Sequence, residues 1–400
     1  MPTGGRQTQF GPRSGVVALV VVALNMRMAV GSVPPILNRL GLSGAEQSFL
    51  VTVPVLCFGG AAWVAPPLRR RFGTEPLILA ALLGLVLGLL WRALLPGWGL
   101  FPGTVLAGLA VAFLNVLVPA LVRGRYAQRA APVTAAYTIA MSIGASLAAG
   151  VTVPLLESSR SLPLALGVWA APAVVGLLVW LTQLMRGARP PRGAPEESTA
   201  GTPMRRIWRD RTAWAVTAYF GLQSMVFYAM LSWLPAIDQS KGASPAVAGG
   251  VLAVLNTVGI AGNVIGPGLA QRWRDQRPAV AVGALLIGLG VGGTLFGGSG
   301  QAFLWAAVLG VGTGSSFALA LLLVVLRSPS PATAVSLSAS AQGVGYVIAA
   351  GGPLLLGLVR EATGGWSVPL VVVLALVLLE LLAGLEAGRA RLVAGGAGAE

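Results

Sequence analysis

The stretch VVALNMRMAVGSVPPIL, residues 21–37, places a permanent cation, Arg27, in the middle of an apolar run. About 20 apolar residues are enough for a helix to cross the roughly 30 Å of a bilayer core. A central arginine costs about 2.5–3.5 kcal/mol on insertion scales. We therefore expect Arg27 to face a wet cavity or a partner within the protein rather than lipid.

Similar apolar runs recur along all 400 residues. The chain is 56% hydrophobic and 10% charged, with a mean hydropathy of +0.81. Soluble domains carry about 25% charged residues. The composition therefore predicts an all-α membrane protein that crosses the bilayer many times.

Apolar windows bounded by turn and charge signals predict twelve spans. The first six run over 15–36, 46–68, 76–95, 100–122, 132–154 and 163–185, and the second six over 213–235, 246–270, 278–299, 301–326, 332–358 and 366–388.

The basic residues orient these spans. Most of the 27 lysines and arginines fall in segments on one predicted side, including Arg69–Arg71 and the Pro-, Gly- and charge-rich segment 186–212. The positive-inside rule then makes both termini cytoplasmic. Arg39, Arg92, Arg160, Lys241 and Arg360 are assigned to outer loops. The expected divisions are a cytoplasmic N-terminus (1–14), two bundles (15–185 and 213–388), a mobile cytoplasmic linker (186–212) and a cytoplasmic tail (389–400).

The two halves repeat one another at an offset near 200 residues. Pro35 and Pro235 are expected to end the first and seventh spans, and Gly41-Leu42-Ser43 matches Gly242-Ala243-Ser244. Further matches pair Pro66 with Pro267 and Pro154 with Pro353. Chance matching of frequent Gly and Pro is the alternative. The repeat predicts two six-helix pseudo-symmetric bundles with a cavity between them near the bilayer midplane.

Several classes of protein are disfavoured. The net charge of +15 sits in short clusters, without the aromatic interleaving of a nucleic-acid surface. Cleavage of residues 1–33 as a signal peptide is disfavoured by the length of the apolar run. With no His and a single Cys, we expect no metal, disulfide or cofactor. Catalytic motifs and a P-loop are absent, so an enzyme or an ATP-driven pump is not expected.

Arg27 is interpreted as an anion-binding group. Glu46, Glu75 and Glu157 all fall at or beyond the ends of the first-bundle spans, so no carboxylate lies at its depth. A planar guanidinium suits carboxylate-like groups. The alternative is that Arg27 caps backbone carbonyls or stacks on aromatic rings between helices.

Other polar or polarizable residues fall at mid-span, where they could line the cavity or act as interhelical hydrogen-bonding groups, each typically worth under about 1 kcal/mol. Tyr228 and the stripe of Ser338, Gln342 and Tyr346 at i,i+4 are assigned to the cavity. Candidate solute contacts are also Asn115, Tyr137, Met141 and Gln223, and structural or gating candidates are Asn25, Arg70, Arg71, Asn256 and Asn263.

Glu380 is the acidic residue inside a predicted span. Its peripheral position and snorkelling favour a structural role over proton coupling. No carboxylate proton relay is therefore expected. Uniport, or co-transport in which the substrate carries its own proton, is left open.

Five segments carry a family resemblance: ALNMRMAVGSVPPIL, TVPVLCFGG, NVLVPALVR, GLQSMVFYAMLSWLPAI and AQGVGYVIAAGGPLLLGLV. They resemble the cyanate permease / 2-nitroimidazole transporter family of the major facilitator superfamily (MFS), over all twelve spans. Asn25-x-Arg27 is the most specific element. Met28 stands where the family has Pro, and Arg70 stands in the Asp position of the superfamily loop Asp-Arg-x-Gly.

The resemblance implies a monomeric transporter of the bacterial inner membrane that moves a small anion or a small polar heteroaromatic. The expected mechanism is rocker-switch alternating access with Arg27 as the anchor. An efflux pump for amphipathic drugs on the same fold is the first rival. A membrane sensor that does not transport is the second, although the longest loop leaves little room for the folded domain that it needs.

Overall fold

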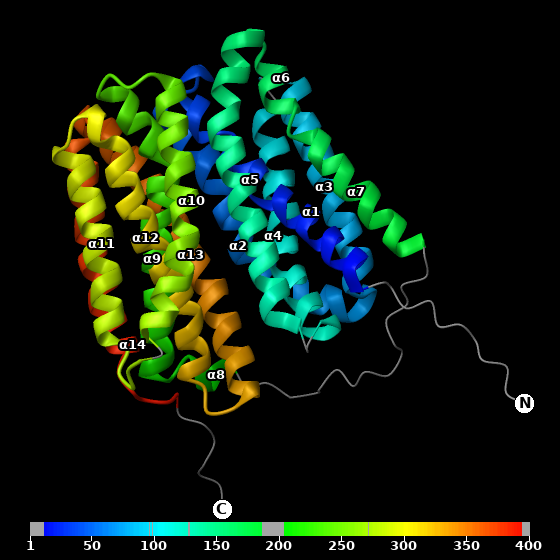
Figure 1. Ribbon diagram of the computed structural model, residues 1–400, viewed down its shortest axis with the longest axis vertical. Helices are drawn as coiled ribbons and strands as arrows, with labels where there is room; N and C mark the ends of the chain where they lie inside the picture. Colours follow the sequence, from blue (N-terminus) through cyan, green and yellow to red (C-terminus); the bar gives the residue numbers. More distant parts are fainter. Residues whose placement is uncertain are drawn as a thin grey trace, which may run out of the picture.

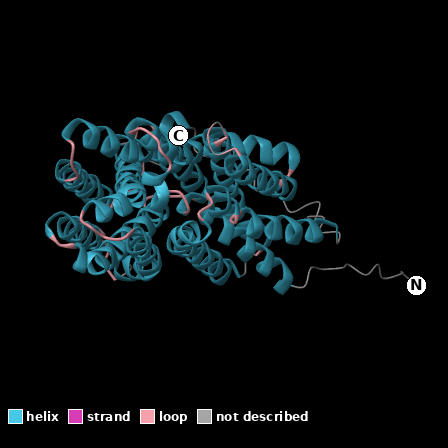
Figure 2. Ribbon diagram, turned by 90° about the horizontal axis from the view of Figure 1, so that it is seen from above, coloured by secondary structure: helices cyan, strands magenta, loops and turns pink. Residues whose placement is uncertain are grey.

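The computed structural model describes residues 12–95, 97, 99–126, 129–185, 204–270 and 272–393. Within these ranges the chain forms helices, turns and loops but no strand (Figure 2). Twelve helical segments are long and apolar enough to span a membrane, as the sequence predicts.

The first bundle begins with α1 (Pro12–Gly31) and the short 3-10 helix η1 (Pro34–Arg39). Its other helices are α2 (Gly44–Phe72), α3 (Thr74–Leu94), α4 (Leu100–Arg125), α5 (Ala130–Ser159), α6 (Leu162–Gly167) and α7 (Ala170–Met185). The sixth predicted span is therefore broken into α6 and α7. The first span is α-helical only to Gly31 and continues as η1.

The second bundle contains α8 (Met204–Ile207), α9 (Arg211–Ser240), α10 (Pro245–Ala270), α11 (Arg277–Phe296), η3 (Ser299–Gln301), α12 (Ala302–Leu326), α13 (Pro331–Thr363) and α14 (Ser367–Ala387). In the C-terminal part of the predicted linker, residues 204–207 form α8, and α9 begins at Arg211. Residues 186–203 lie outside the described residues. The predicted tail is docked as far as Val393, whose N–H bonds to the Arg327 carbonyl at 2.8 Å.

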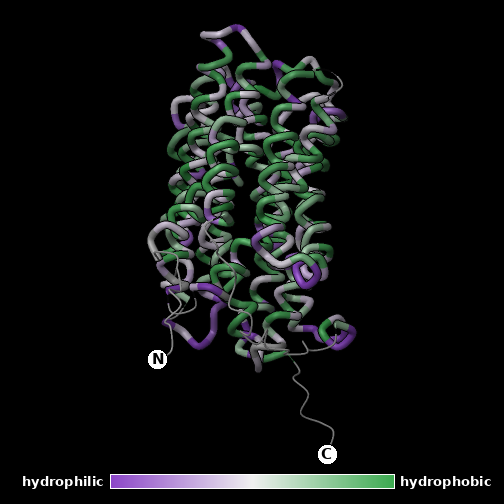
Figure 3. Tube along the Cα trace, turned by 90° about the vertical axis from the view of Figure 1, so that its right-hand side faces the viewer, coloured by the Kyte–Doolittle hydropathy of each residue, from purple (hydrophilic) through white to green (hydrophobic). Residues whose placement is uncertain are grey.

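The two bundles lie side by side (Figure 1). Helix α1 packs on α5 and α7, and α3 on α4, whereas α9 packs on α13 and α14, and α10 on α12. Hydrophobic residues dominate the length of the helices and hydrophilic ones gather at their ends (Figure 3). We call the end that holds the start of α1 and the end of α14 the terminal end, and the opposite one the far end.

The turns at the far end confirm the internal repeat. Gly41 and Gly242 both have positive φ, +68° and +90°, which glycine adopts at little cost. Two residues later, Ser43 and Ser244 each accept a backbone N–H at the start of the next helix. The prediction for Pro235 was wrong, because α9 continues through it to Ser240.

The bundles are joined at the far end. One hydrophobic core there takes residues from both, among them Ile36 and Leu50 from the first and Trp233 and Leu255 from the second. The core of the second bundle at the terminal end contains residues of that bundle alone. A Trp63–Trp208 ring pair at 6.2 Å bridges the bundles on that side.

Candidate functional site

Arg27 lies at the interface of the two bundles. It is near the middle of the span Ser14–Arg39, and its side chain is partly buried. The guanidinium carbon lies 5.6 Å from the centroid of the Phe227 ring on α9, in the other bundle. Within the described ranges, no carboxylate forms an ion pair with Arg27.

An aromatic cluster from three helices surrounds this position. Tyr228 on α9 lies 6.4 Å from Tyr346 on α13, and Phe58 on α2 contacts both rings at 6.0 and 5.5 Å. Phe227 packs on Tyr228 at 5.1 Å. The charge of Arg27 acts electrostatically on both tyrosines. The structure therefore brings together Arg27, Tyr228 and Tyr346, three of the residues singled out in the sequence.

Phe58 and Phe227 were missed by the sequence analysis. Phe58 sits in the TVPVLCFGG segment, where Gly59 lets α13 approach α2, because a Cβ at this position would lie 3.0 Å from Val347. Phe227 is adjacent to Tyr228 and about 100° away from it on the helix, so spacing alone did not group them.

Ser338, Gln342 and Tyr346 follow one another at intervals of about one turn along α13. Gln342 donates its Nε2 to Ser338 Oγ at 2.8 Å, and Tyr346 lies one turn further on. Gln223 differs from expectation: it is 1% exposed, and its Nε2 donates to the Phe220 carbonyl and to Ser224 Oγ. Its amide N–H groups are thus used within α9.

The remaining candidate contacts come from the first bundle. Tyr137 and Met141 on α5 are partly buried and pack against a hydrophobic core that contains residues of both bundles, among them Tyr228 and Ala349 of the second. Asn115 on α4 is also partly buried.

The structural candidates divide into two groups. Asn25 donates to the carbonyls of Val21 and of Pro172 on α7, and so ties α1 to a neighbouring helix. Asn256 donates to the Leu252 carbonyl within α10, and Asn263 is partly buried on the same helix. Arg70 and Arg71 are exposed in the last turn of α2, with Arg71 over the Phe72 ring at 5.2 Å.

The assignment of Arg92 to an outer loop, made from the sequence, is wrong. Arg92 lies in α3 and is 1% exposed. Its Nη1 and Nη2 donate to the Ala29 carbonyl and to Ser32 Oγ, at 2.9 and 2.8 Å. Because α1 ends at Gly31, its last carbonyls lack helical partners. Arg92 supplies a donor to one of them, the Ala29 carbonyl.

The expectation that Glu380 snorkels to the membrane surface is also wrong. Glu380 is 0% exposed within the second bundle. Sequence position alone could not show this, because the residues that cover it come from other helices.

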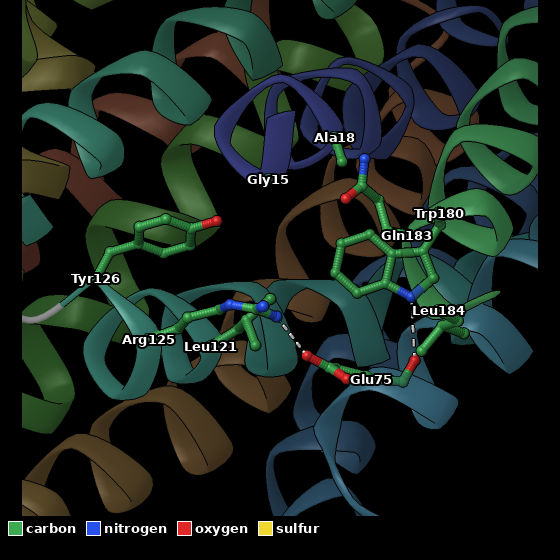
Figure 4. A pocket seen from close by; sticks show the side chains of 9 residues that line it. All are labelled: Gly15, Ala18, Glu75, Leu121, Arg125, Tyr126, Trp180, Gln183 and Leu184. Carbon is green, nitrogen blue, oxygen red and sulfur yellow. Dashed lines mark hydrogen bonds and ion pairs between the residues drawn. The ribbon is translucent and has the colours of Figure 1, made fainter. Parts of the chain in front are cut away.

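Two pockets contain charged side chains. The first lies in the first bundle and is crossed by an ion pair of 2.6 Å between Arg125 Nη1 and Glu75 Oε1 (Figure 4). Trp180 donates to the Glu75 carbonyl, and burial raises the pKa of Tyr126 on the opposite wall. The second lies between the bundles and is lined by Arg92, Thr104, Tyr228 and Ser232 among others.

Two pseudo-symmetric six-helix bundles, with Arg27 where they meet, are typical of a secondary transporter of the membrane. The chain belongs to the Major Facilitator Superfamily, whose profile matches residues 15–351. It is thus a multi-pass transporter of the bacterial inner membrane, and not an enzyme.

Curated relatives support the narrower resemblance. The chain is 34% identical to the 2-nitroimidazole transporter of Escherichia coli (strain K12), over 94% of this chain and 95% of the relative. It is 31% identical to the cyanate transport protein CynX of the same organism, over 92% and 96%. An uncharacterized transporter of Bacillus subtilis (strain 168), YycB, is 34% identical over 94% of both.

Solved structures share the fold. A bacterial homologue of the lysosomal transporter Spinster, in an inward-facing conformation, superposes with a TM-score of 0.76 at 15% identity, covering 95% of this chain and 97% of that one. The nucleoside transporter NupG gives 0.74 at 13% identity, over 93% and 99%.

Proposed function

We propose that this chain moves a small anion or small polar solute, of the cyanate, carboxylate or nitroheterocycle kind, by alternating access, with Arg27 as the anchor. The observation that carries the proposal is the position of Arg27: a cation at the bundle interface that no described carboxylate neutralises. A planar guanidinium binds the two oxygens of a carboxylate or nitro group through parallel N–H donors.

The aromatic cluster supports a flat solute. The rings of Tyr228, Tyr346 and Phe58 lie within 6.4 Å of one another, and Phe227 lies beneath the guanidinium. Such faces stack on a planar heteroaromatic or flank a rod-like anion. Further lining comes from Ser338, Gln342, Asn115, Tyr137 and Met141, whereas Gln223 belongs to the packing of α9.

The joined far end supports alternating access. With both termini in the cytoplasm, the closed far end faces outward and the conformation is the inward-facing one. Tags fused at the two ends test this orientation. A tag at either end that reacts with an impermeant probe in intact cells would reverse it.

Efflux of a planar drug is the second candidate, and the aromatic cluster is the observation that favours it. Overexpression distinguishes the two: an efflux pump raises resistance to nitroheterocycles, whereas an uptake carrier increases sensitivity to them.

The Arg27 assignment is tested on the purified protein with cyanate, acetate and 2-nitroimidazole as probes. An anionic probe present at about 100 times its Kd should stabilise the folded protein by about 2.7 kcal/mol, seen as a rise in Tm. Arg27→Ala should abolish the rise and Arg27→Lys should weaken it, with the Tm of the unliganded protein nearly unchanged.

Arg39→Ala is the matched control, because Arg39 is exposed in an ion pair with Glu157 at the far end. It should keep the response to the probes. If Arg27→Ala binds and transports as the wild type does, the anchor assignment is wrong.

A further inference from the structure

Three polar side chains meet inside the second bundle, away from the aromatic cluster. Glu380 on α14, Tyr219 on α9 and Ser316 on α12 are at most 1% exposed. Glu380 interacts electrostatically with Tyr219, and the Ser316 hydroxyl lies close to both. None of their four side-chain oxygens forms a well-aligned hydrogen bond with another described residue.

No positive charge accompanies this carboxyl group. Helix α14 packs on α9, α11 and α13. Of the titratable groups on α9, α11, α12, α13 and α14, Tyr219 is the one that interacts electrostatically with Glu380. The others on these helices are Arg211, Tyr228, Asp238, Arg277, Tyr346, Arg360, Glu361 and Glu386. Arg327, beyond α12, is bound to the Ala387 and Gly388 carbonyls at the end of α14.

An ionised carboxylate without a cation is costly in such a place, so the buried group is the neutral acid. The surroundings are tight. A Cβ at Gly283 would lie 2.9 Å from Ser316 Oγ, and one at Gly384 would lie 2.8 Å from the Tyr219 ring. A proton fits here without further space, whereas a metal cation needs several ligands around it.

The cluster is connected to the candidate solute site through the same two helices. Phe220 and Phe317 directly follow Tyr219 and Ser316, and their rings pack on each other at 6.2 Å. Phe220 also contacts Tyr346, at 5.4 Å. A change in how α9 and α12 meet at Glu380 therefore moves rings that contact the aromatic cluster.

We propose that Glu380 is a proton-binding site whose protonation is linked to the transport cycle. The Glu380 carboxyl is protonated while α9, α12 and α14 are packed around it as they are here. It releases its proton to water when these three helices rearrange. A proton that moves with a monovalent anion cancels the net charge on which the membrane potential acts. The transport half of this proposal rests on the proposed function, whereas the proton site does not.

The site itself is tested without any solute. Infrared difference spectra of the purified protein report the C=O stretch of protonated carboxylic acids. They are recorded between about pH 5 and about pH 9, above the pH at which an exposed glutamate loses its proton. Asp238 and Glu75 are also buried and contribute bands of their own. We expect the band of Glu380 to be the one that is lost in Glu380→Gln and shifted in Tyr219→Phe. The exposed carboxyl in Glu361→Gln is the control and should leave the band in place.

Transport is tested in proteoliposomes with labelled cyanate and 2-nitroimidazole. A gradient of about one pH unit can sustain roughly tenfold accumulation of a solute coupled to one proton. Glu380→Gln should lose this accumulation but keep solute exchange without a gradient, and Tyr219→Phe should shift its pH dependence. The Tyr219→Phe measurements also decide the matter if Glu380→Gln does not fold.

Two results would overturn the proposal. One is a Glu380 band that stays unchanged over the whole pH range, which would make the residue a fixed structural acid. The other is undiminished pH-driven accumulation in Glu380→Gln. Absence of transport of both probes by the wild type would count against the proposed solutes, and the infrared result would still decide the proton site.

Discussion

Two arginines lie within the apolar part of the first bundle, and their surroundings differ. Arg27 is partly buried at the bundle interface, over an aromatic ring. Arg92 is buried and holds the end of α1 through the Ala29 carbonyl and Ser32. Arg92 is thus committed to the fold, whereas Arg27 is the side chain that we propose as the solute anchor.

We predict that Arg92→Ala is strongly destabilising. It removes two hydrogen bonds from buried acceptors and leaves a cavity, together worth about 3 kcal/mol or more. Arg92→Lys should retain part of the stability, because one donor can still reach Ala29. Thermal unfolding in detergent measures both.

Arg39→Ala provides the comparison, since an exposed ion pair is worth at most about 1 kcal/mol. Should Arg92→Ala unfold at the wild-type temperature but fail to bind anions, Arg92 would belong to the solute site instead.

The sequence could show that Arg27 lies at membrane depth, but it could not show that Arg92 and Glu380 are buried within the protein. A cation in the middle of an apolar run is visible from its neighbours along the chain. Arg92 stands close to the end of a run, where lysine and arginine normally reach the interface. Glu380 is covered by Tyr219 and Ser316, which are distant in sequence, so its burial depends on packing that the sequence pattern does not encode.

Glycines set the closest helix contacts of the second bundle. On α10 and α12, a Cβ at Gly262 would lie 2.3 Å from the Val311 carbonyl oxygen, and one at Gly314 would lie 2.1 Å from that of Gly259. Small residues allow backbones to approach in this way in membrane helices. The α10–α12 pair therefore tolerates no side chain at these points.

We predict that Gly314→Ala destabilises the protein by about 1–3 kcal/mol, because the added methyl forces the two backbones apart. Gly288→Ala on α11 is the matched control, since nothing lies within 4 Å of the added Cβ. It should cause no loss of stability. Equal unfolding temperatures for the two variants would contradict the tight α10–α12 contact.

Helix ends were less predictable than helix number. Apolar windows located all twelve spans, but they missed the terminal turns of helices that continue into polar residues. Thus α9 continues through Pro235 to Ser240, and α13 ends only at Thr363, before Gly364 with its φ of +71°. The break between α6 and α7 has no marker in the apolar pattern of LPLALGVWAAP.

At the scale of the whole molecule, the repeat in the sequence correctly predicted two similar bundles. It could not predict which end of the molecule is closed, because that depends on contacts between the halves. The contacts at the far end include the hydrogen bond from Gln239 of α9 to the Pro35 carbonyl and a core shared by both bundles. Transport by alternating access requires these contacts to separate.

Cross-linking across the bundles tests that requirement. A Cβ at Gly150 on α5 would lie 3.9 Å from the Ala253 Cβ on α10, close to the roughly 3.8 Å of a disulfide. Gly150→Cys with Ala253→Cys, in a background without Cys57, should form a bond on oxidation. We expect transport in proteoliposomes to stop and to return on reduction, because the bundles can no longer rock apart.

The control is a bond of similar geometry inside one bundle. A Cβ at Gly84 on α3 would lie 3.7 Å from the Ala110 Cβ on α4, so Gly84→Cys with Ala110→Cys should also oxidise. Since α3 and α4 move together when a bundle rocks as a rigid body, this bond should leave transport intact. Continued transport by the oxidised Gly150→Cys/Ala253→Cys protein would show that α5 and α10 stay together throughout the cycle, and the far-end contacts would then not be the gate.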